Sequence, residues 1–177
     1  NDSRVVIGAA LLTLGYDVNT TDEAQLEEAK QKLLALMPNI YKFDSDSPKD
    51  KLISGEADLG IVWNGEAFLA QQENPALQYV YPQEGSIIFY DGMGISTTAP
   101  HPDVAYAWLN YLLQGNNNWL TLVDYPYTNP NQGALNYAQE NQPEIYEAYI
   151  NSNITNTPVQ EFLNGHEVID LGAALLL

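Results

Sequence analysis

The chain has 177 residues, 45% of them hydrophobic, which suits one globular domain or two small lobes. Six Lys and Arg against 23 Asp and Glu give a net charge of −17. This balance argues against a nucleic-acid partner, because phosphate binding needs a basic surface. It favours cationic ligands, although solubility alone also explains it. The absence of Cys excludes disulfides and thiolate zinc sites.

Three helices are expected in the first third of the chain, because apolar residues recur there at helical spacing between capping signals. Thr20 and Glu23 have the spacing of a capping box, and Gly15 and Gly55 are expected to end the first and third helices. The expected helices run from Asp2 or Ser3 to Leu14, from Thr20 to Met37, and from Ser47-Pro48 to Gly55.

The hydrophobic pattern changes near residue 57. Short runs rich in apolar, β-branched and aromatic residues predict strands at 57–63, 77–81 and 86–95, with a helix at 65–72. The first run is apolar throughout and is therefore expected to be a buried strand. Helices that alternate with short apolar strands indicate a layered α/β fold, in which ligands bind in a crevice at the strand ends.

The remainder of the chain is expected to be mostly helical. Helices are expected at 101–114, 118–123, 132–139, 144–150 and 159–163, with a turn-rich loop over 125–133. No apolar run approaches the roughly 20 residues of a membrane helix, and no signal peptide is recognisable. Residues 1–4 and 171–177 look like the start and the middle of helices, so we expect a piece of a longer protein.

Five segments carry a recognisable set of motifs. Residues 55–70 read GEADLGIVWNGEAFLA, residues 36–47 read LMPNIYKFDSDS, and residues 82–95 read PQEGSIIFYDGMGI. Residues 127–131 read YTNPN, and an aspartate stands ahead of a helix in residues 1–4. Taken in their order along the chain, the segments resemble the periplasmic spermidine/putrescine-binding proteins, which are type II solute-binding proteins. The resemblance covers the part of that family after its first lobe.

The resemblance implies a layered α/β lobe with a hinge-crossing strand and C-terminal helices. It implies three parts: residues 1–91 as the C-terminal-type ligand-binding lobe, 92–124 as the hinge strand and helices that return toward the other lobe, and 125–177 as the loop and helices that rejoin the first part.

The implied function is that of the substrate-binding component of an ABC importer for putrescine or spermidine. Such a protein is not an enzyme, uses no cofactor or metal, and lies in the periplasm or anchored outside the cytoplasmic membrane. Its partners are a polyamine and a membrane permease. We also expect this piece to self-associate through surface that the other lobe would cover.

Four aromatic and acidic residues are the main candidates for the ligand wall. Trp63 ends the first apolar run, so its ring is expected either at a strand mouth or in the core. Asp91 is an acidic residue in a strand-like run, and the resemblance makes it the carboxylate that holds an ammonium group. Phe89 shares its strand face and stands where the family tends to have Trp. Tyr127 lies in the Pro/Asn loop, with Tyr125 as its rival.

Two further candidates have competing structural roles. Ser45 matches a family serine that hydrogen-bonds a ligand, but turn capping is the other interpretation. Asp2 matches a ligand-facing aspartate, and a helix N-cap is the alternative. The chain departs from the family at Val5, where a Glu is frequent, and near Val168, where a Gln is frequent. Fewer anionic contacts imply fewer ligand ammonium groups or a shifted pose, so both putrescine and spermidine stay open.

Two other functions compete with this interpretation. The same fold with aromatic walls and carboxylates also suits a carbohydrate ligand. A glycosidase-like enzyme would need two carboxylates in a cleft, and Asp44 with Asp46 is a candidate pair that a polar turn explains better. His101 and His166 lie far apart in sequence and flank helices, which suits helix ends better than a metal site.

Overall fold

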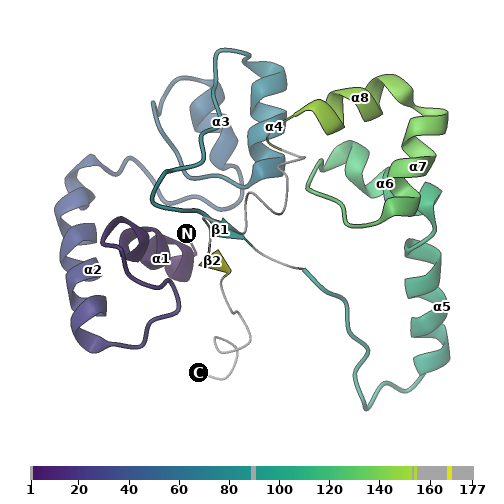
Figure 1. Ribbon diagram of the computed structural model, residues 1–177, viewed down its shortest axis with the longest axis horizontal. Coiled ribbons are helices and arrows are strands. Elements are labelled where there is room, and N and C mark those ends of the chain that lie inside the picture. The colour runs from purple at the N-terminus through teal and green to yellow at the C-terminus, as the bar shows by residue number, and fades with distance from the viewer. Residues whose placement is uncertain (1, 89–90, 153, 155–166, 169–177) are drawn as a thin grey trace. The chain divides into compact units, whose positions relative to one another are not determined.

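The computed structural model describes residues 2–88, 91–152, 154 and 167–168 of the 177-residue chain (Figure 1). The chain divides into two compact units, one with residues Asn1–Pro48, Tyr79–Tyr90 and Pro158–Leu177, the other with Lys49–Gln78 and Asp91–Thr157. Because these units group residues by contact, they do not test the division expected at residues 91 and 124, which stays a prediction.

The first unit contains two packed helices, a short 3₁₀ helix and two short strands. These are α1 (Ser3–Thr13), α2 (Glu23–Leu36), η1 (Met37–Asn39), β1 (Ile87–Ile88) and β2 (Glu167–Val168). Helices α1 and α2 lie side by side and bury Ala10, Leu11 and Ala29 between them (Figure 1). Leu14 and Leu33 pack against this cluster and lie four residues after Ala10 and Ala29, so each helix presents an apolar face to the other.

The N-terminal caps of α1 and α2 are both aspartates. Asp2 Oδ1 accepts hydrogen bonds from the backbone amides of Arg4 and Val5 at 3.0 and 3.3 Å. Asp22 caps α2 by accepting from the amides two and three residues later. The expected capping box at Thr20 is therefore wrong. Thr20 Oγ1 instead accepts from the Asp22 amide at 3.2 Å, because an Asp nearer the first turn reaches the free amides.

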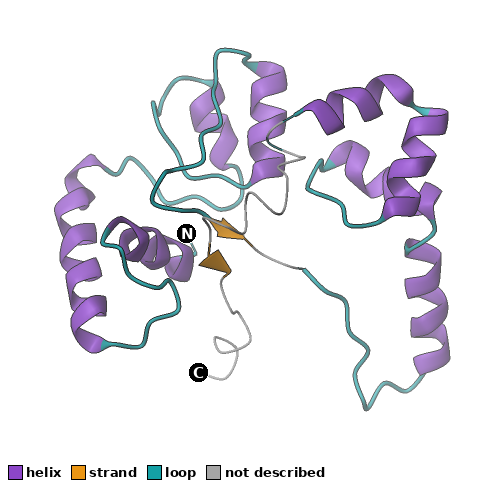
Figure 2. Cartoon of the chain, in the orientation of Figure 1, coloured by secondary structure: helices purple, strands orange, loops and turns teal. Residues whose placement is uncertain are grey.

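The strands are much shorter than expected. β1 pairs in parallel with β2, with Ile87 opposite Glu167 and Ile88 opposite Val168. The strands expected at 57–63 and 77–81 are wrong, since neither described segment is a strand (Figure 2). Leu59 and Ile61 are 91% and 73% exposed, so the apolar run is not buried. A strand needs a neighbouring strand to pair with, and within the described residues the strand pairing is that of β1 with β2.

Helices joined by loops make up the second unit where it is described, with no strand among those residues. Its helices are α3 (Pro48–Ile53, starting at the boundary between the units), α4 (Asn64–Glu73), α5 (Pro102–Leu112), α6 (Gly115–Asp124), α7 (Gln132–Asn141) and α8 (Pro143–Asn151). All six follow the expected ranges within three residues, so those helix predictions are confirmed. The helix expected at 159–163 lies outside the described residues. The described residues are thus mostly helical with one two-stranded sheet, a partial α/β lobe.

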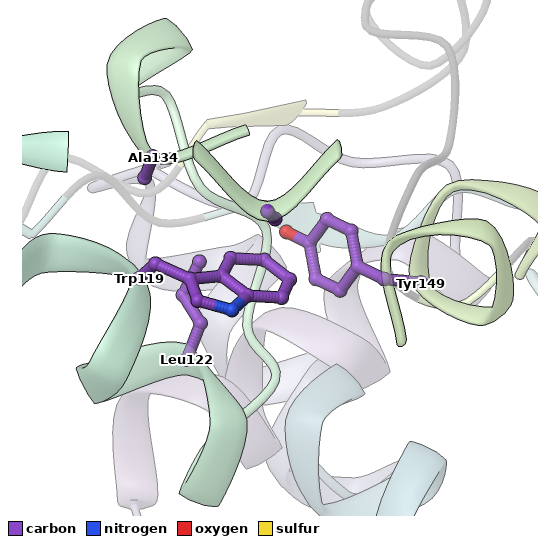
Figure 3. Packing of buried hydrophobic residues seen from close by; sticks show 5 residues of the cluster. Trp119, Leu122, Ala134 and Tyr149 are labelled. Atoms are coloured by element: carbon purple, nitrogen blue, oxygen red, sulfur yellow. The ribbon is translucent and has the colours of Figure 1, made fainter. Parts of the chain in front are cut away.

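The core of the second unit lies among α6, α7 and α8. Trp119, Leu122, Ala134, Ala138 and Tyr149 are buried together (Figure 3). The ring of Trp119 meets that of Tyr149 edge to face, with centroids 5.9 Å apart. Its indole Nε1 donates to Gln142 Oε1 at 2.6 Å. This packing fixes α8 and with it the hydroxyl of Tyr149, which reaches the loop before α7.

Helix α5 contrasts with this core. None of its residues is buried, and Val104, Trp108 and Tyr111 are more than half exposed. The rings of Trp108 and Tyr111 stack on each other with centroids 5.7 Å apart. Among the described residues, no helix is long and apolar enough to cross a membrane.

Candidate functional site

The second unit contains three of the six candidate residues, Trp63, Asp91 and Tyr127. Asp2 and Ser45 belong to the first unit. Phe89 lies outside the described residues. The second unit therefore contains two of the expected aromatic rings and the expected carboxylate, and the site is built from it.

Trp63 is the N-cap residue of α4 and has extended backbone angles, φ −64° and ψ 148°. Its carbonyl oxygen accepts the amide of Ala67 at 2.9 Å, which begins the helix. The expectation that it ends a strand is wrong, but its side chain is 36% exposed and is not a core residue. Helix α4 thus presents the indole at its N-terminus, the end where the helix dipole is positive.

Tyr127 lies against the same end of α4. A Cβ atom on Gly65 would come within 3.0 Å of ring atoms Cε1 and Cζ of Tyr127. The neighbouring residues are also joined: Asn64, which precedes Gly65, donates from Nδ2 to Oγ1 of Thr128, which follows Tyr127, at 3.1 Å. The ring is 37% exposed, so one part packs on the helix and another part remains accessible. The loop is therefore attached to the N-terminus of α4 by an aromatic contact and a hydrogen bond.

The backbone of Tyr127 is also held by Tyr149 of α8. The Tyr149 hydroxyl donates to the carbonyl oxygen of Tyr127 at 2.8 Å and accepts the amide of Asn129 at 2.9 Å. Burial raises the pKa of the Tyr149 hydroxyl, so it stays protonated and able to donate at neutral pH. Asn129 Nδ2 donates in turn to Asn118 Oδ1 at 2.7 Å. These bonds give the loop a defined shape.

An ion pair that the sequence interpretation missed lies beside Tyr127. Lys49 Nζ of α3 is 2.7 Å from Glu66 Oε2 of α4, and these side chains are 22% and 10% exposed. The hydrogen bond to Glu66 raises the pKa of Lys49 despite partial burial, so the ammonium is charged at neutral pH. Glu66 stands in the first turn of α4, where the dipole favours an anion. An acidic first turn was the signal available for Glu66, but nothing in the sequence pointed to its partner.

The charges around Tyr127 also include Asp91. Burial is the main cause that raises the pKa of Tyr127, and the negative charges of Glu66 and Asp91 raise it further, while Lys49 opposes them. Asp91 itself is exposed. An accessible carboxylate within electrostatic reach of a half-exposed ring suits an organic ammonium ion, which gains from both groups.

Ser45 lies in a turn organised by its neighbour. Asp44 Oδ1 accepts the amides of Asp46 and Ser47 at 3.0 and 3.2 Å, and Asp44 Oδ2 pairs with Lys42 Nζ at 2.6 Å. The Lys42 hydrogen bond and these two amides lower the pKa of Asp44 to about 2. Ser45 is exposed on this turn. Asp44 and Asp46 are thus part of a polar turn. This agrees with the interpretation that competed with a glycosidase-like pair of carboxylates.

Asp2 is the N-cap of α1, the structural role that the sequence left open beside ligand binding. His101 is the N-cap residue of α5, a helix-end position as expected, and His166 lies outside the described residues. Within the described ranges, no group of three or more His, Cys, Asp and Glu side chains is placed to hold a metal ion.

Comparison with known proteins gives a consistent result. The family model described as bacterial extracellular solute-binding protein matches residues 1–152. The spermidine/putrescine-binding periplasmic protein of Salmonella typhimurium is 42% identical over 114 residues, which are 64% of this chain and 33% of that protein. The protein of the same name from Escherichia coli is 34% identical over 174 residues, 98% of this chain and 48% of the relative. The chain thus spans half or less of these relatives' length.

A solved structure agrees with these sequence matches. The putative spermidine/putrescine ABC transporter protein of Listeria monocytogenes superposes with a TM-score of 0.83 at 31% identity, over 98% of this chain and 51% of its own. The similarity therefore extends along nearly the whole chain and is to part of a longer protein.

Proposed function

Because the chain belongs to the bacterial extracellular solute-binding protein family, which is a family of binding proteins and not of enzymes, we propose that it serves in the capture of a polyamine, putrescine or spermidine, for an ABC importer. The protein acts outside the cytoplasmic membrane and delivers its ligand to a membrane permease. The fold class expected from the sequence, part of a type II periplasmic binding protein, agrees with the structural similarity.

The observation that carries this proposal is the packing of the Tyr127 ring on the N-terminus of α4, where Trp63 is the N-cap residue, with the negative charge of Asp91 acting on the same ring. A polyamine is a flexible chain of methylene groups between ammonium groups, so it needs carboxylates for its charges and ring faces for the rest. A cation over a ring gains about 0.5–2 kcal/mol, and a charge-assisted hydrogen bond about 1.5–3 kcal/mol. Micromolar binding needs about 8 kcal/mol, so several such contacts must act together.

The proposed ligand wall consists of the ring of Trp63, the ring of Tyr127 and the carboxylate of Asp91. Phe89, Ser45 and Asp2 are proposed to add a further ring, a hydroxyl and a second carboxylate. The relatives named for spermidine and putrescine favour a polyamine over a carbohydrate. The absence of a Glu at Val5 and of a Gln near Val168 still leaves putrescine and spermidine as alternatives.

Thermal-shift measurements on the full-length protein test this function. We expect stabilisation by putrescine or spermidine and none by glucose or maltose at the same concentrations. A ligand at 100 times its dissociation constant adds about 2.7 kcal/mol to the unfolding free energy, an effect that is easily measured. Stabilisation by the sugars without the polyamines would contradict the proposal and favour the carbohydrate alternative.

The 177-residue chain by itself is expected to bind more weakly than micromolar, because it spans about half of the relatives' length and closure around the ligand is incomplete. We also propose that the isolated chain self-associates through exposed apolar side chains such as Leu59 and Trp108. Light scattering at two concentrations checks self-association, and a concentration-independent monomer mass would rule it out.

A further inference from the structure

The second unit contains an ammonium group of its own beside the proposed ligand wall. Lys49 Nζ lies 2.7 Å from Glu66 Oε2. Glu66 directly follows Gly65, whose backbone the Tyr127 ring contacts. The negative charge of Glu66 raises the pKa of Tyr127, and the positive charge of Lys49 lowers it. The pair therefore lies close enough to this ring to affect any cation that binds there.

The Lys49–Glu66 pair is an ammonium–carboxylate ion pair, the same kind of contact that a polyamine would form with a carboxylate of the ligand wall. A carboxylate next to an aromatic ring is the combination that binds a ligand ammonium group. At Glu66 that carboxylate is already neutralised by Lys49, whereas Asp91 remains exposed. Lys49 thus reduces by one the number of uncompensated negative charges near Tyr127.

From this geometry we propose that Lys49 is a specificity-determining residue, and the proposal rests on the polyamine function above. Its ammonium group limits how much positive charge the site accepts, and so biases the site from a triamine such as spermidine toward a diamine such as putrescine. Without the Lys49 charge, the negative charge of Glu66 is no longer compensated. It then attracts a ligand with more ammonium groups more strongly. Removing the Glu66 charge leaves Lys49 uncompensated and has the opposite effect.

Calorimetric titration of the full-length protein at pH 8 tests this assignment, with putrescine and spermidine as ligands. The measured quantity is the ratio of the two dissociation constants in the unchanged protein and in Lys49→Met, Glu66→Gln and the double variant. We expect Lys49→Met to shift the ratio about tenfold toward spermidine, the size of one charge-assisted hydrogen bond. Glu66→Gln shifts it toward putrescine, and the double variant returns near the original value.

Lys51→Met is the matched control. Lys51 belongs to the same helix α3 but pairs with Glu56 at 3.0 Å, and that carboxylate is 45% exposed. The control removes the same charge from the same helix, so it is expected to leave the ratio unchanged. A shift in this control as large as that in Lys49→Met would show a net-charge effect and overturn the inference.

Stability is measured in parallel, because a carboxylate that is nearly buried and loses its partner destabilises the folded protein. If Lys49→Met does not fold, Glu66→Gln and the double variant still give the ratio. A purely structural ion pair would lower the melting temperature of the single variants without changing the ratio, which would overturn this inference alone. Absence of polyamine binding by the unchanged protein would overturn the proposed function as well.

Discussion

The ring of Tyr127 packs on the backbone of Gly65, 62 residues earlier in the chain, so closely that a Cβ atom there would lie 3.0 Å from the ring. This contact joins the loop before α7 to the N-terminus of α4. The aromatic surface proposed to bind a polyamine thus depends on a residue without a side chain. The glycine of the WNG sequence has a packing reason to be there.

Gly65→Ala is expected to destabilise the protein. Alanine in a helix is ordinarily about 1 kcal/mol more favourable than glycine. Here the added methyl group displaces the Tyr127 ring, and such overpacking costs about 1–3 kcal/mol. Urea denaturation measures the loss, and calorimetry should show weaker polyamine binding. Gly94→Ala is the control, because a Cβ there meets nothing within 4 Å. Equal effects of the two substitutions would refute the packing argument.

Tyr149→Phe is expected to loosen the Tyr127 loop. The substitution keeps the ring in contact with Trp119 but removes the hydroxyl that bridges the Tyr127 carbonyl and the Asn129 amide. Two polar groups lose a partner, so the unfolding free energy should fall by about 1–3 kcal/mol. Urea denaturation measures this loss. Tyr146→Phe is the matched control, because Tyr146 also belongs to α8 and packs against the same core. A loss no larger than in that control would count against the bridging role.

Asp91→Asn in the full-length protein is expected to weaken polyamine binding at least about tenfold, because a charge-assisted hydrogen bond becomes a neutral one. The side chain is exposed, so the urea midpoint should hardly change. Calorimetry at two salt concentrations measures the effect, and the variant should also depend less on salt. Glu140→Gln, an exposed carboxylate on α7, serves as the control. Unchanged affinity for both polyamines would remove Asp91 from the site.

The turn that carries Ser45 should depend on pH through Asp44. Its pKa is about 2 in the folded protein, chiefly because of the hydrogen bond from Lys42, and about 3.9 when unfolded. A lowered pKa stabilises the folded state above pH 4, and this contribution is lost as the pH falls from about 4 to about 2. Carboxyl NMR titration measures the pKa directly. Asp44→Asn should lose this part of the pH dependence, whereas Asp46→Asn should keep it.

The helices could be predicted from the sequence because their signals are local. The apolar spacing and the end residues of α1, α4 and α7 lie within one or two turns of each helix, and the structure begins and ends them close to the expected positions. The cap of α2 was misassigned between Thr20 and Asp22, since both residue types cap helices and only the geometry of the first turn distinguishes them. The candidate residues came from motifs that resemble a family, which identify positions but not contacts.

The sequence by itself therefore determined the helices, the acidic charge and the motifs that led to Trp63, Asp91 and Tyr127. Tertiary structure alone decided the contact of Tyr127 with Gly65 and the pairing of Lys49 with Glu66, whose partners lie 62 and 17 residues apart in the chain. It also decided that residues 57–63 form no strand. The physical reason is the same in each case: a helix satisfies its hydrogen bonds within itself, whereas strands, ion pairs and aromatic contacts need a partner that only folding brings near.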